Sequence, residues 1–594
     1  MNNDQTSPQA EADVLTQHAM LVAWGVYAQH IGLVKRLEKV KLHQKTRDHT
    51  PQKKVLEFLV ATLAGVPHLK DISRAAHPLD QDVVTAEAWG QKAWADYSGV
   101  SRTLQSLTET ETAELIQVLD DVEKPVLDQE IELALHQNGC LVYDGDLTGR
   151  PVSSTSISYP DAAFGYMGDG VELGYQAAVV SVGSPTFGRL WVVDQLHSGD
   201  TVSSSQAQAL VKAAEARTGV RPLRRSNLVA DRLAQIEAAR LLSEEQREES
   251  QFRLHEAKGK VQETADQLAH WQQEIGWLEA DYQRDGRMPT PHCRLTRARQ
   301  KLKTFQTRLP RVQAQLAKAQ RRFDRHDRAG QALYTEAEQL KAHLAALESE
   351  NQANPTPIRA IFRLDSGFAT QENMAWMIEM GYDLYTKARA PKIKERLLAA
   401  ATTENPEWVR VGDNAHLTAW PQTTVEGSLP YPMDVALAHY QTGDTQSHAV
   451  LLHYGQDPVT QDVDGWFHMY NGRQTIEAGI KEGKGVFQMH HLKVRSTQAL
   501  LLQERFACFA ANFVRRAAHW LSTQEQHLPP MQGDSVKHLV QVSANTSAWV
   551  RRQGDVWLLT FTKQSLYAGY SLQLGGGIVQ LPLPFMHNIH FHHF

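Results

Sequence analysis

The spacing of apolar residues along the chain changes near residue 139. Before it, apolar side chains recur every three to four residues, which is typical of helices. The clearest of these segments are Met20–Leu37, Gln52–Ala64 and Glu109–His136. After it, short apolar runs bounded by turn residues take over, which is typical of strands. We therefore expect residues 1–135 to form an N-terminal helical domain.

Two separate stretches of the chain have the pattern of a mixed α/β sheet, because each combines β-rich runs with a helical segment. The predicted strands are Cys140–Tyr143, Tyr175–Val182, Arg189–Val193, Ile358–Leu364 and Tyr382–Thr386, and the predicted helices are Ser204–Arg217 and Gln371–Met380. We expect one core built from residues 136–222 and 356–400 and completed by a helical part at 465–525.

The stretch between them, residues 223–355, is charged and rich in Gln and Ala. Its apolar residues repeat every seven positions in two series, from Val261 to Tyr282 and from Leu302 to Phe323. Two heptad helices joined by the segment Gly286–Pro291 predict an inserted antiparallel coiled-coil hairpin. Its function is open between a dimerisation arm and an arm that spans DNA, and a heptad seam favours dimerisation.

Two further stretches are β-rich. Residues 401–464 are expected to form an insertion, and residues 526–594 a C-terminal region with strands in Ala548–Thr562 and Tyr570–Leu581. The fold class is thus α/β with several domains, since a chain of 594 residues is too long for one core.

Composition narrows the class of protein. Hydrophobic residues make up 42% and charged residues 22% of the chain, and no uncharged apolar run reaches about 18 residues, so no membrane span is expected. The three cysteines are far apart and predict neither a disulfide framework nor a zinc site, which favours a reducing cytoplasm.

The net charge of −6 means that a protein binding nucleic acid must concentrate its basic residues. They gather in two clusters, one that includes Lys35 and Arg36 and one that includes Lys387, Arg389 and Lys392. In addition, Tyr97–Leu104 resembles the turn and start of a DNA-recognition helix. We therefore expect the N-terminal domain to bind DNA.

Three acidic residues have the order that two-metal phosphoryl transfer requires. Asp146 and Asp365 follow predicted strands, where acids on adjacent strands can share a metal, and Glu477 lies on a later predicted helix. A single acid at a strand end is more often a turn or helix cap, and Asp144 competes with Asp146 as the first acid.

The third acid belongs to a stripe of polar residues. On one α-helix, Tyr470, Arg473, Glu477 and Lys484 would fall within a sector roughly 60° wide. Such a stripe is typical of a solvated face with ion pairs. It is equally what a helix needs to hold a metal-binding acid beside a phosphate backbone, with the basic groups and the phenol binding DNA.

These motifs resemble those of the DDE transposases of bacterial insertion sequences. The branch in question has Tyr, two residues, Arg, three, Glu, six and Lys, a spacing that Tyr470 to Lys484 matches without a gap. Asp146-Leu-Thr148 resembles the family's first-acid motif, which favours Asp146 over Asp144. Arg363-Leu-Asp365-Ser-Gly-Phe368 resembles its second, with Leu364 in place of the usual Gly.

The resemblance covers roughly residues 15–220 and 356–525. It implies an RNase H-like catalytic core in which Asp146, Asp365 and Glu477 bind Mg²⁺, with Mn²⁺ as a substitute. It implies cleavage at insertion-sequence ends and strand transfer into target DNA, by a homodimer on double-stranded DNA in the bacterial cytoplasm, at the nucleoid. Two alternatives remain open: a host-adapted metal-dependent nuclease on the same fold, and a catalytically inactive DNA-binding coiled-coil protein.

Overall fold

The computed structural model describes residues 13–45, 48–153, 159–425, 427, 429–489, 494–523, 535–565 and 567–575. Contacts between residues divide the chain into two units. We call Met1–Leu223 with Thr356–Phe594 the core unit, and Arg224–Pro355 the hairpin unit. No helix in the described part of the chain is both long enough and apolar enough to cross a membrane.

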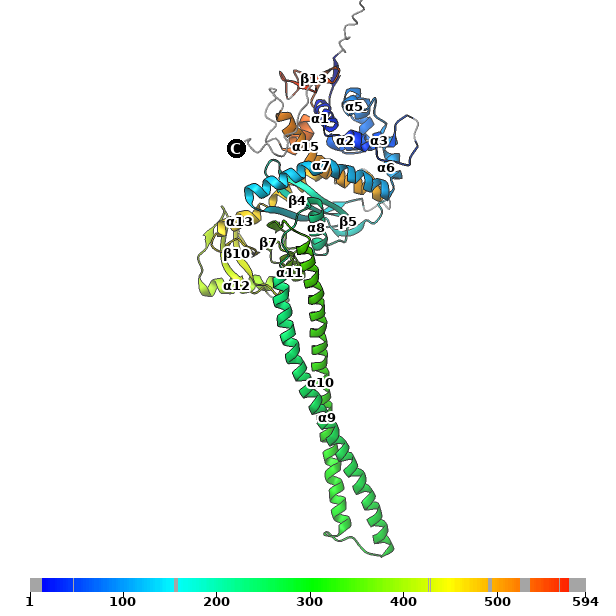
Figure 1. Cartoon of the computed structure of the whole chain (residues 1–594), viewed down its shortest axis with the longest axis vertical. Coiled ribbons are helices and arrows are strands. Elements are labelled where there is room, and N and C mark those ends of the chain that lie inside the picture. The colour runs from blue at the N-terminus through cyan, green and yellow to red at the C-terminus, as the bar shows by residue number, and fades with distance from the viewer. Residues whose placement is uncertain are drawn as a thin grey trace, which may run out of the picture. The chain divides into compact units, whose positions relative to one another are not determined.

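A mixed sheet of ten strands organises the core unit (Figure 1). Its strands are β2 (Leu141–Pro151), β3 (Ala163–Tyr166), β4 (Val171–Ser184), β5 (Gly188–Ser198), β6 (Ala360–Arg363), β7 (Asp383–Lys387), β8 (Val409–Arg410), β9 (Ala415–Thr423), β10 (Met433–Thr442) and β11 (Thr445–Tyr454). Their order is β4-β2-β6-β7-β11-β10-β9-β8, with β3 and β5 both paired to the outer edge of β4. The pairings β2–β6 and β6–β7 are parallel and the others antiparallel.

The predicted strands of the two α/β stretches are confirmed, and so is their union in one sheet. Helices connect and cover these strands, namely α8 (Ser203–Thr218), α11 (Gln371–Glu379), α12 (Pro391–Glu404), α13 (Val463–Asn471) and α14 (Gln474–Gly485). Helix α12 was not predicted, because its sequence reads as a basic cluster with little apolar periodicity.

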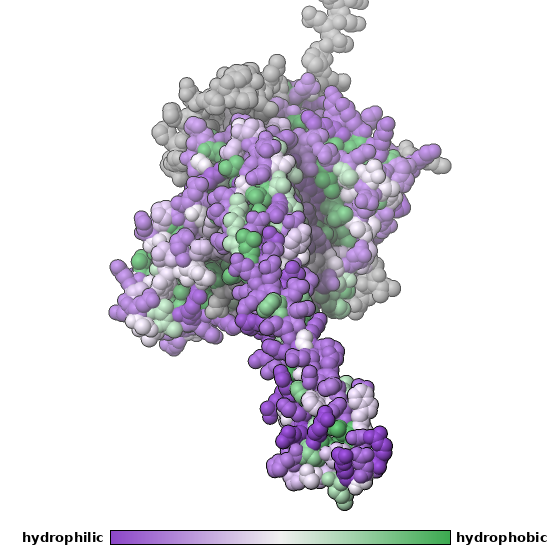
Figure 2. Space-filling view, turned by 60° about the horizontal axis from the view of Figure 1, so that its bottom comes forward, coloured by the Kyte–Doolittle hydropathy of each residue, from purple (hydrophilic) through white to green (hydrophobic). Residues whose placement is uncertain are grey.

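The hairpin unit consists of two long paired helices, α9 (Ser226–Arg284) and α10 (Arg294–Gln352). Ion pairs Arg247–Asp327 and Arg299–Glu279 join residues whose numbers rise on one helix as they fall on the other, so the helices are antiparallel. The predicted coiled-coil hairpin is thus confirmed. Hydrophilic side chains cover most of its surface in Figure 2, since a two-helix seam hides only one narrow stripe of each helix.

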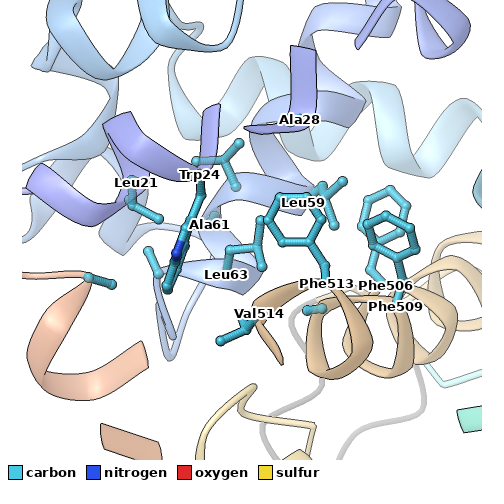
Figure 3. Packing of buried hydrophobic residues seen from close by; sticks show 14 of the residues in the cluster. Leu21, Trp24, Ala28, Leu59, Ala61, Leu63, Phe506, Phe509, Phe513 and Val514 are labelled. Carbon is cyan, nitrogen blue, oxygen red and sulfur yellow. The ribbon is translucent and has the colours of Figure 1, made fainter. Parts of the chain in front are cut away.

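The N-terminal region is helical, as predicted, and shares one hydrophobic core with a helix from the other end of the chain. Its helices are α1 (Ala19–His30), α2 (Leu33–Leu37), α3 (Pro51–Leu63), α4 (Asp71–Arg74), α5 (Val83–Ala88), α6 (Tyr97–Ser106) and α7 (Glu109–Asn138), with a 3₁₀ turn at Leu79–Gln81. In Figure 3, Leu59 of α3 lies beside Phe513 of α15 (Thr497–Ser522), and Trp24 of α1 belongs to the same buried cluster. Burial of these large side chains fixes α15 against the N-terminal helices.

One local prediction in this region is correct only in part. The segment Tyr97–Leu104, expected to include the turn and the start of a recognition helix, lies wholly within α6, so the turn precedes it. Asp96 caps that helix, because its Oδ1 accepts a hydrogen bond from the Gly99 nitrogen at 2.6 Å.

A separate antiparallel sheet of four strands contains both ends of the described chain. It has the order β1 (Val14–Thr16), β12 (Ala548–Gln553), β13 (Val556–Phe561) and β14 (Ser571–Leu574), and α16 (Val536–His538) with a π-turn at Leu539–Ser543 precedes β12. The strands expected near Ala548 and Tyr570 are present, although the expected end of the last one, near Leu581, lies outside the described residues. Strand β1 was not predicted, since three residues carry too little periodicity.

The helical core contains a carboxyl group that should make stability depend on pH. Glu57 is fully buried, and this burial raises its pKa to about 8. The unfolded chain therefore releases this proton near pH 4.5, whereas the fold retains it up to about pH 8. Across that window the contribution of Glu57 to the free energy of unfolding falls as the pH rises. Glu57→Gln should remove this fall. The melting temperature of the variant should therefore rise relative to that of the wild type between pH 5 and pH 9.

Glu111 provides the opposite control. Burial acts to raise the pKa of Glu111, but hydrogen bonds from Thr108 and His43 lower it to about 2. The charged form of Glu111 therefore stabilises the fold above pH 4.5. Glu111→Gln should lower the melting temperature at neutral pH. Equal melting temperatures of wild type and Glu57→Gln at pH 5 and pH 9 would contradict the assignment of a buried, protonated Glu57.

Candidate active site

Asp146 lies in the middle of the mixed sheet. The parallel pairing of β2 with β6 ends at Asp144 opposite Arg363, whereas β4 pairs with β2 as far as Pro151. The prediction that Asp146 follows the end of its strand is therefore wrong, because β4 extends the strand beyond the parallel pairing. Asp146 nevertheless lies two residues past the last parallel pair, where β6 no longer pairs with β2.

Asp365 lies beside this end of the parallel pairing. It follows the end of β6 by two residues, and its Oδ1 accepts a hydrogen bond from the Gly367 nitrogen at 2.9 Å. The Leu364 side chain packs over Gly145 of β2, where a Cβ would lie 2.7 Å from a Leu364 methyl group. A glycine in β2 thus leaves room for the leucine that replaces the glycine of the family motif.

Glu477 reaches the same place from α14. Arg473, at the N-terminal end of this helix, binds both acids, with Nη1 3.0 Å from Glu477 Oε1 and Nη2 3.1 Å from Asp146 Oδ2. The guanidinium is 9% exposed, whereas the Glu477 side chain is 50% exposed. One buried cation therefore bridges the strand acid and the helix acid.

Electrostatic interactions link the three acids. Burial raises the pKa of Asp146 to about 6; Arg473 opposes this rise, and the charges of Asp365 and Glu477 add to it. The same three carboxylates raise the pKa of Arg473 against the effect of burial. The raised pKa of Asp146 thus comes first from burial and then from the neighbouring acids.

The polar stripe of the sequence does not lie on one helix, which corrects that prediction. Tyr470 belongs to α13, and the chain tightens before α14, where the Arg473 nitrogen bonds to the Tyr470 carbonyl at 3.1 Å. The carbonyl of Met469, which a regular helix would offer to Arg473, accepts instead from Nη1 of Arg363 at 2.8 Å. Gly472 is necessary here, because a Cβ would lie 2.2 Å from that guanidinium.

Asp144 forms a buried ion pair with the same arginine, Arg363. Its two carboxylate oxygens accept from Nε and Nη2 of Arg363 at 2.6 and 2.7 Å, and the pair is about nine-tenths buried. Both lone-pair directions of Asp144 are thus engaged within the protein. This pairing favours Asp146 as the acid available to a ligand.

Two lysines flank the acids. Lys387, at the end of β7, lies with its ammonium 5.2 Å from the centre of the Tyr470 ring, and burial lowers its pKa. Burial also lowers the pKa of Lys484, which lies close enough to Asp146 and Arg150 for their charges to act on it. Tyr470 itself is buried and donates its hydroxyl to the Leu364 carbonyl at 3.4 Å.

The remaining predicted DNA-binding residues are exposed and lie elsewhere in the chain. Arg389 follows β7, Lys392 opens α12, and Lys35 and Arg36 lie on α2. Among the described residues, no hydrogen bond or ion pair joins them to the three acids, and their role on DNA stays a prediction.

Sequence reasoning missed Arg150. It shares one face of β2 with Asp146, because the two are four residues apart on a strand, and it is almost fully buried against Glu504 of α15 at 2.9 Å. Alternation of polar residues at Asp144, Asp146, Thr148 and Arg150 was the signal that could have revealed it.

Three carboxylates are the hard oxygen donors that Mg²⁺ prefers. In donor chemistry, Asp146, Asp365 and Glu477 fit such an ion. In the part of the chain that the structure describes, however, no three Asp, Glu, His or Cys side chains are near enough to one another to hold a metal together. Arg473 and the half-exposed Glu477 would have to move for all three acids to share one ion.

Comparison of the chain with models of known protein families found no match, and a search among curated proteins found none either.

The geometry predicts different effects for the two acids of β2. Asp144→Ala leaves Arg363 buried without its carboxylate, which should cost about 3–5 kcal/mol of stability. Asp146→Ala removes a carboxylate whose raised pKa of about 6 means that its charge destabilises the fold above pH 6. At pH 8 with EDTA, thermal unfolding should show a larger loss for Asp144→Ala than for Asp146→Ala, because Arg473 keeps Glu477 as a partner when Asp146 is removed. Equal losses would mean that both acids have structural roles.

Proposed function

We propose that this protein is a DNA transposase of the DDE class, which cleaves DNA at the ends of an insertion sequence and joins them to target DNA. The observation that carries the proposal is that Arg473 binds both Asp146 and Glu477, while Asp365 lies close enough for its charge to act on Asp146. These residues come from three segments far apart in the chain.

The arrangement of the sheet supports an RNase H-like core. Three antiparallel strands, β5, β4 and β2, continue into the parallel strands β6 and β7. Two acids lie where the antiparallel and parallel parts meet, which is where neighbouring strands can direct side chains at one ligand.

Asp146, Asp365 and Glu477 would hold Mg²⁺ or Mn²⁺. A divalent cation bound there supplies positive charge to the attacking and leaving oxygens of a phosphodiester. Lys387 and Lys484 flank the acids with ammonium groups whose burial costs free energy, so both gain when a phosphate pairs with them. Double-stranded DNA is the substrate, and a homodimer acting on two DNA ends at the bacterial nucleoid is the expected assembly.

Removal of any of the three acids should abolish catalysis. Asp146→Asn, Asp365→Asn and Glu477→Gln should each stop Mg²⁺-dependent cleavage of a duplex that carries the inverted repeats flanking the coding sequence. Binding of that duplex should persist, because the phosphate contacts remain. The control is Asp464→Asn, an exposed acid on α13, which should cleave like the wild type.

Cleavage and joining are scored separately on gels. Cleavage without joining of 3′ ends would indicate the nuclease instead. Full cleavage by Asp365→Asn would exclude this residue from the active site, and binding without cleavage by the wild type would indicate an inactive DNA-binding protein.

Arg473 should not tolerate lysine. Its two terminal nitrogens bind two different carboxylates, whereas the single ammonium group of lysine cannot contact both in the same way. Single-turnover cleavage should fall about a hundredfold or more in Arg473→Lys, in line with the loss of a positioning group. Lys484→Arg, which keeps a point contact to phosphate, should be milder. Wild-type rates for both Arg473→Lys and Lys484→Ala would mean that the stripe is only a solvated charged face.

A further inference from the structure

The first half of α10 has a charge composition unlike the rest of the chain. Residues 294–323 contain ten Lys and Arg residues and no Asp or Glu. On a solvated helix, acids three or four residues away usually neutralise the bases. Within this segment such neutralisation is impossible, although the whole protein has a net charge of −6.

The heptad register gathers these cations on one flank of the helix. Relative to the seam residues Leu302, Leu309 and Leu316, the cations occupy two neighbouring heptad positions, about 50° apart around the helix. One position contains Arg297, Arg311, Lys318 and Arg325, and the other Lys301, Arg308 and Arg322. Arg294 has the same heptad position as Lys301 but forms an ion pair with Glu274 and is left out of the set. All seven side chains are exposed, and we call them the basic stripe. From Arg297 to Arg325 the stripe is roughly 42 Å long, at 1.5 Å per residue.

Helix α9 does not neutralise the stripe. Ion pairs between the helices near their connection use Arg294 with Glu274 at 3.9 Å and Arg299 with Glu279 at 2.6 Å, neither of which includes a stripe residue. Across the hairpin unit, which the structure describes throughout, no residue of the stripe forms an ion pair.

The column of α9 that faces the stripe has charges of both signs. Because Arg294 faces Glu274, steps of seven residues place Gln267 opposite Lys301 and Lys260 opposite Arg308. The neighbouring position of α9 contains Glu249, Glu256 and Glu263. The basic flank therefore belongs to α10 alone.

A second copy of this chain is a poor partner for this flank. The apolar seam of the hairpin is already filled by its own two helices, with Ile275, Leu295 and Ala298 buried between them. Two basic stripes brought together would repel each other. The charge pattern requires a polyanion with regularly spaced charges along a length of tens of ångströms.

We propose that the basic stripe binds the phosphate backbone of double-stranded DNA, over about 12 base pairs at 3.4 Å each. This inference takes DNA as the polyanion from the proposed function, and it assigns the hairpin to DNA contact instead of dimerisation. The contact is to phosphates and carries no base specificity, because arginine and lysine side chains at heptad spacing follow a backbone and do not converge on one base pair.

The test compares two double variants of the full-length protein. Arg311→Gln with Lys318→Gln removes two stripe charges, and Lys258→Gln with Lys303→Gln removes two exposed charges of the same hairpin outside the stripe. Gln is a good helix former, and circular dichroism checks that both variants keep the helices. Binding of a random-sequence duplex of about 60 base pairs is measured in EDTA over a range of salt concentrations.

The stripe variant should bind about tenfold or more weakly at about 0.1 M salt, and the slope of log affinity against log salt should fall by about 2. The control variant should match the wild type. Equal affinity of all three proteins would overturn the stripe while leaving the proposed catalysis intact. Weaker binding of the stripe variant to phosphatidylserine vesicles, with duplex binding unchanged, would overturn the DNA assignment as well.

The two proposals can fail separately. Because the binding assay contains EDTA and no specific ends, it does not depend on catalysis. Stripe-dependent duplex binding by a protein that never cleaves with Mg²⁺ would support the stripe and contradict the transposase. If the wild type cleaves with Mg²⁺ and the stripe variant binds the duplex as tightly as the wild type, the result would support the transposase and contradict the stripe.

Discussion

Arg363 holds together the three segments on which the candidate site depends. Its guanidinium binds both oxygens of Asp144 on the neighbouring strand and, through Nη1, the Met469 carbonyl at the end of α13. A planar group with several donors in fixed directions can do this where a lysine could not. Because β2, β6 and the α13–α14 junction meet at one side chain, the positions of Asp146, Asp365 and Arg473 follow from that of Arg363.

This arrangement separates the structural charges from those available for chemistry. Asp144 and Arg363 neutralise each other inside the sheet, and Arg150 and Glu504 do so beneath α15. Above them Arg473 lies between Asp146 and Glu477, and burial keeps the pKa of Asp146 raised to about 6. Buried pairs of this kind contribute geometry more than stability, since the cost of removing charges from water offsets much of their attraction. What they provide here is fixed geometry beneath the candidate site.

The hairpin unit solves a different electrostatic problem. The proposed DNA contact of a protein with net negative charge depends on cations that lie together, and a heptad helix provides this by repeating one position every seven residues. The seam of α9 and α10 uses the apolar positions, which leaves the flanks free to carry charge of one sign. The same periodicity therefore specifies both the pairing of the helices and the continuity of the basic stripe.

Local patterns determined much of this protein before any contact was known. Heptads specify α9 and α10 because each helix needs only its own repeat, and β-rich runs specify β4 through β7 because a short apolar run between turn residues is visible within a few residues. The order of Asp146, Asp365 and Glu477 named the candidate acids. Tertiary structure alone decided what depends on distant partners. The helix breaks before α14 because Arg363, more than a hundred residues away, takes the Met469 carbonyl, and Asp144 is structural because that same arginine binds it. Such pairings leave no periodic trace in the sequence, since they join residues whose separation along the chain is arbitrary.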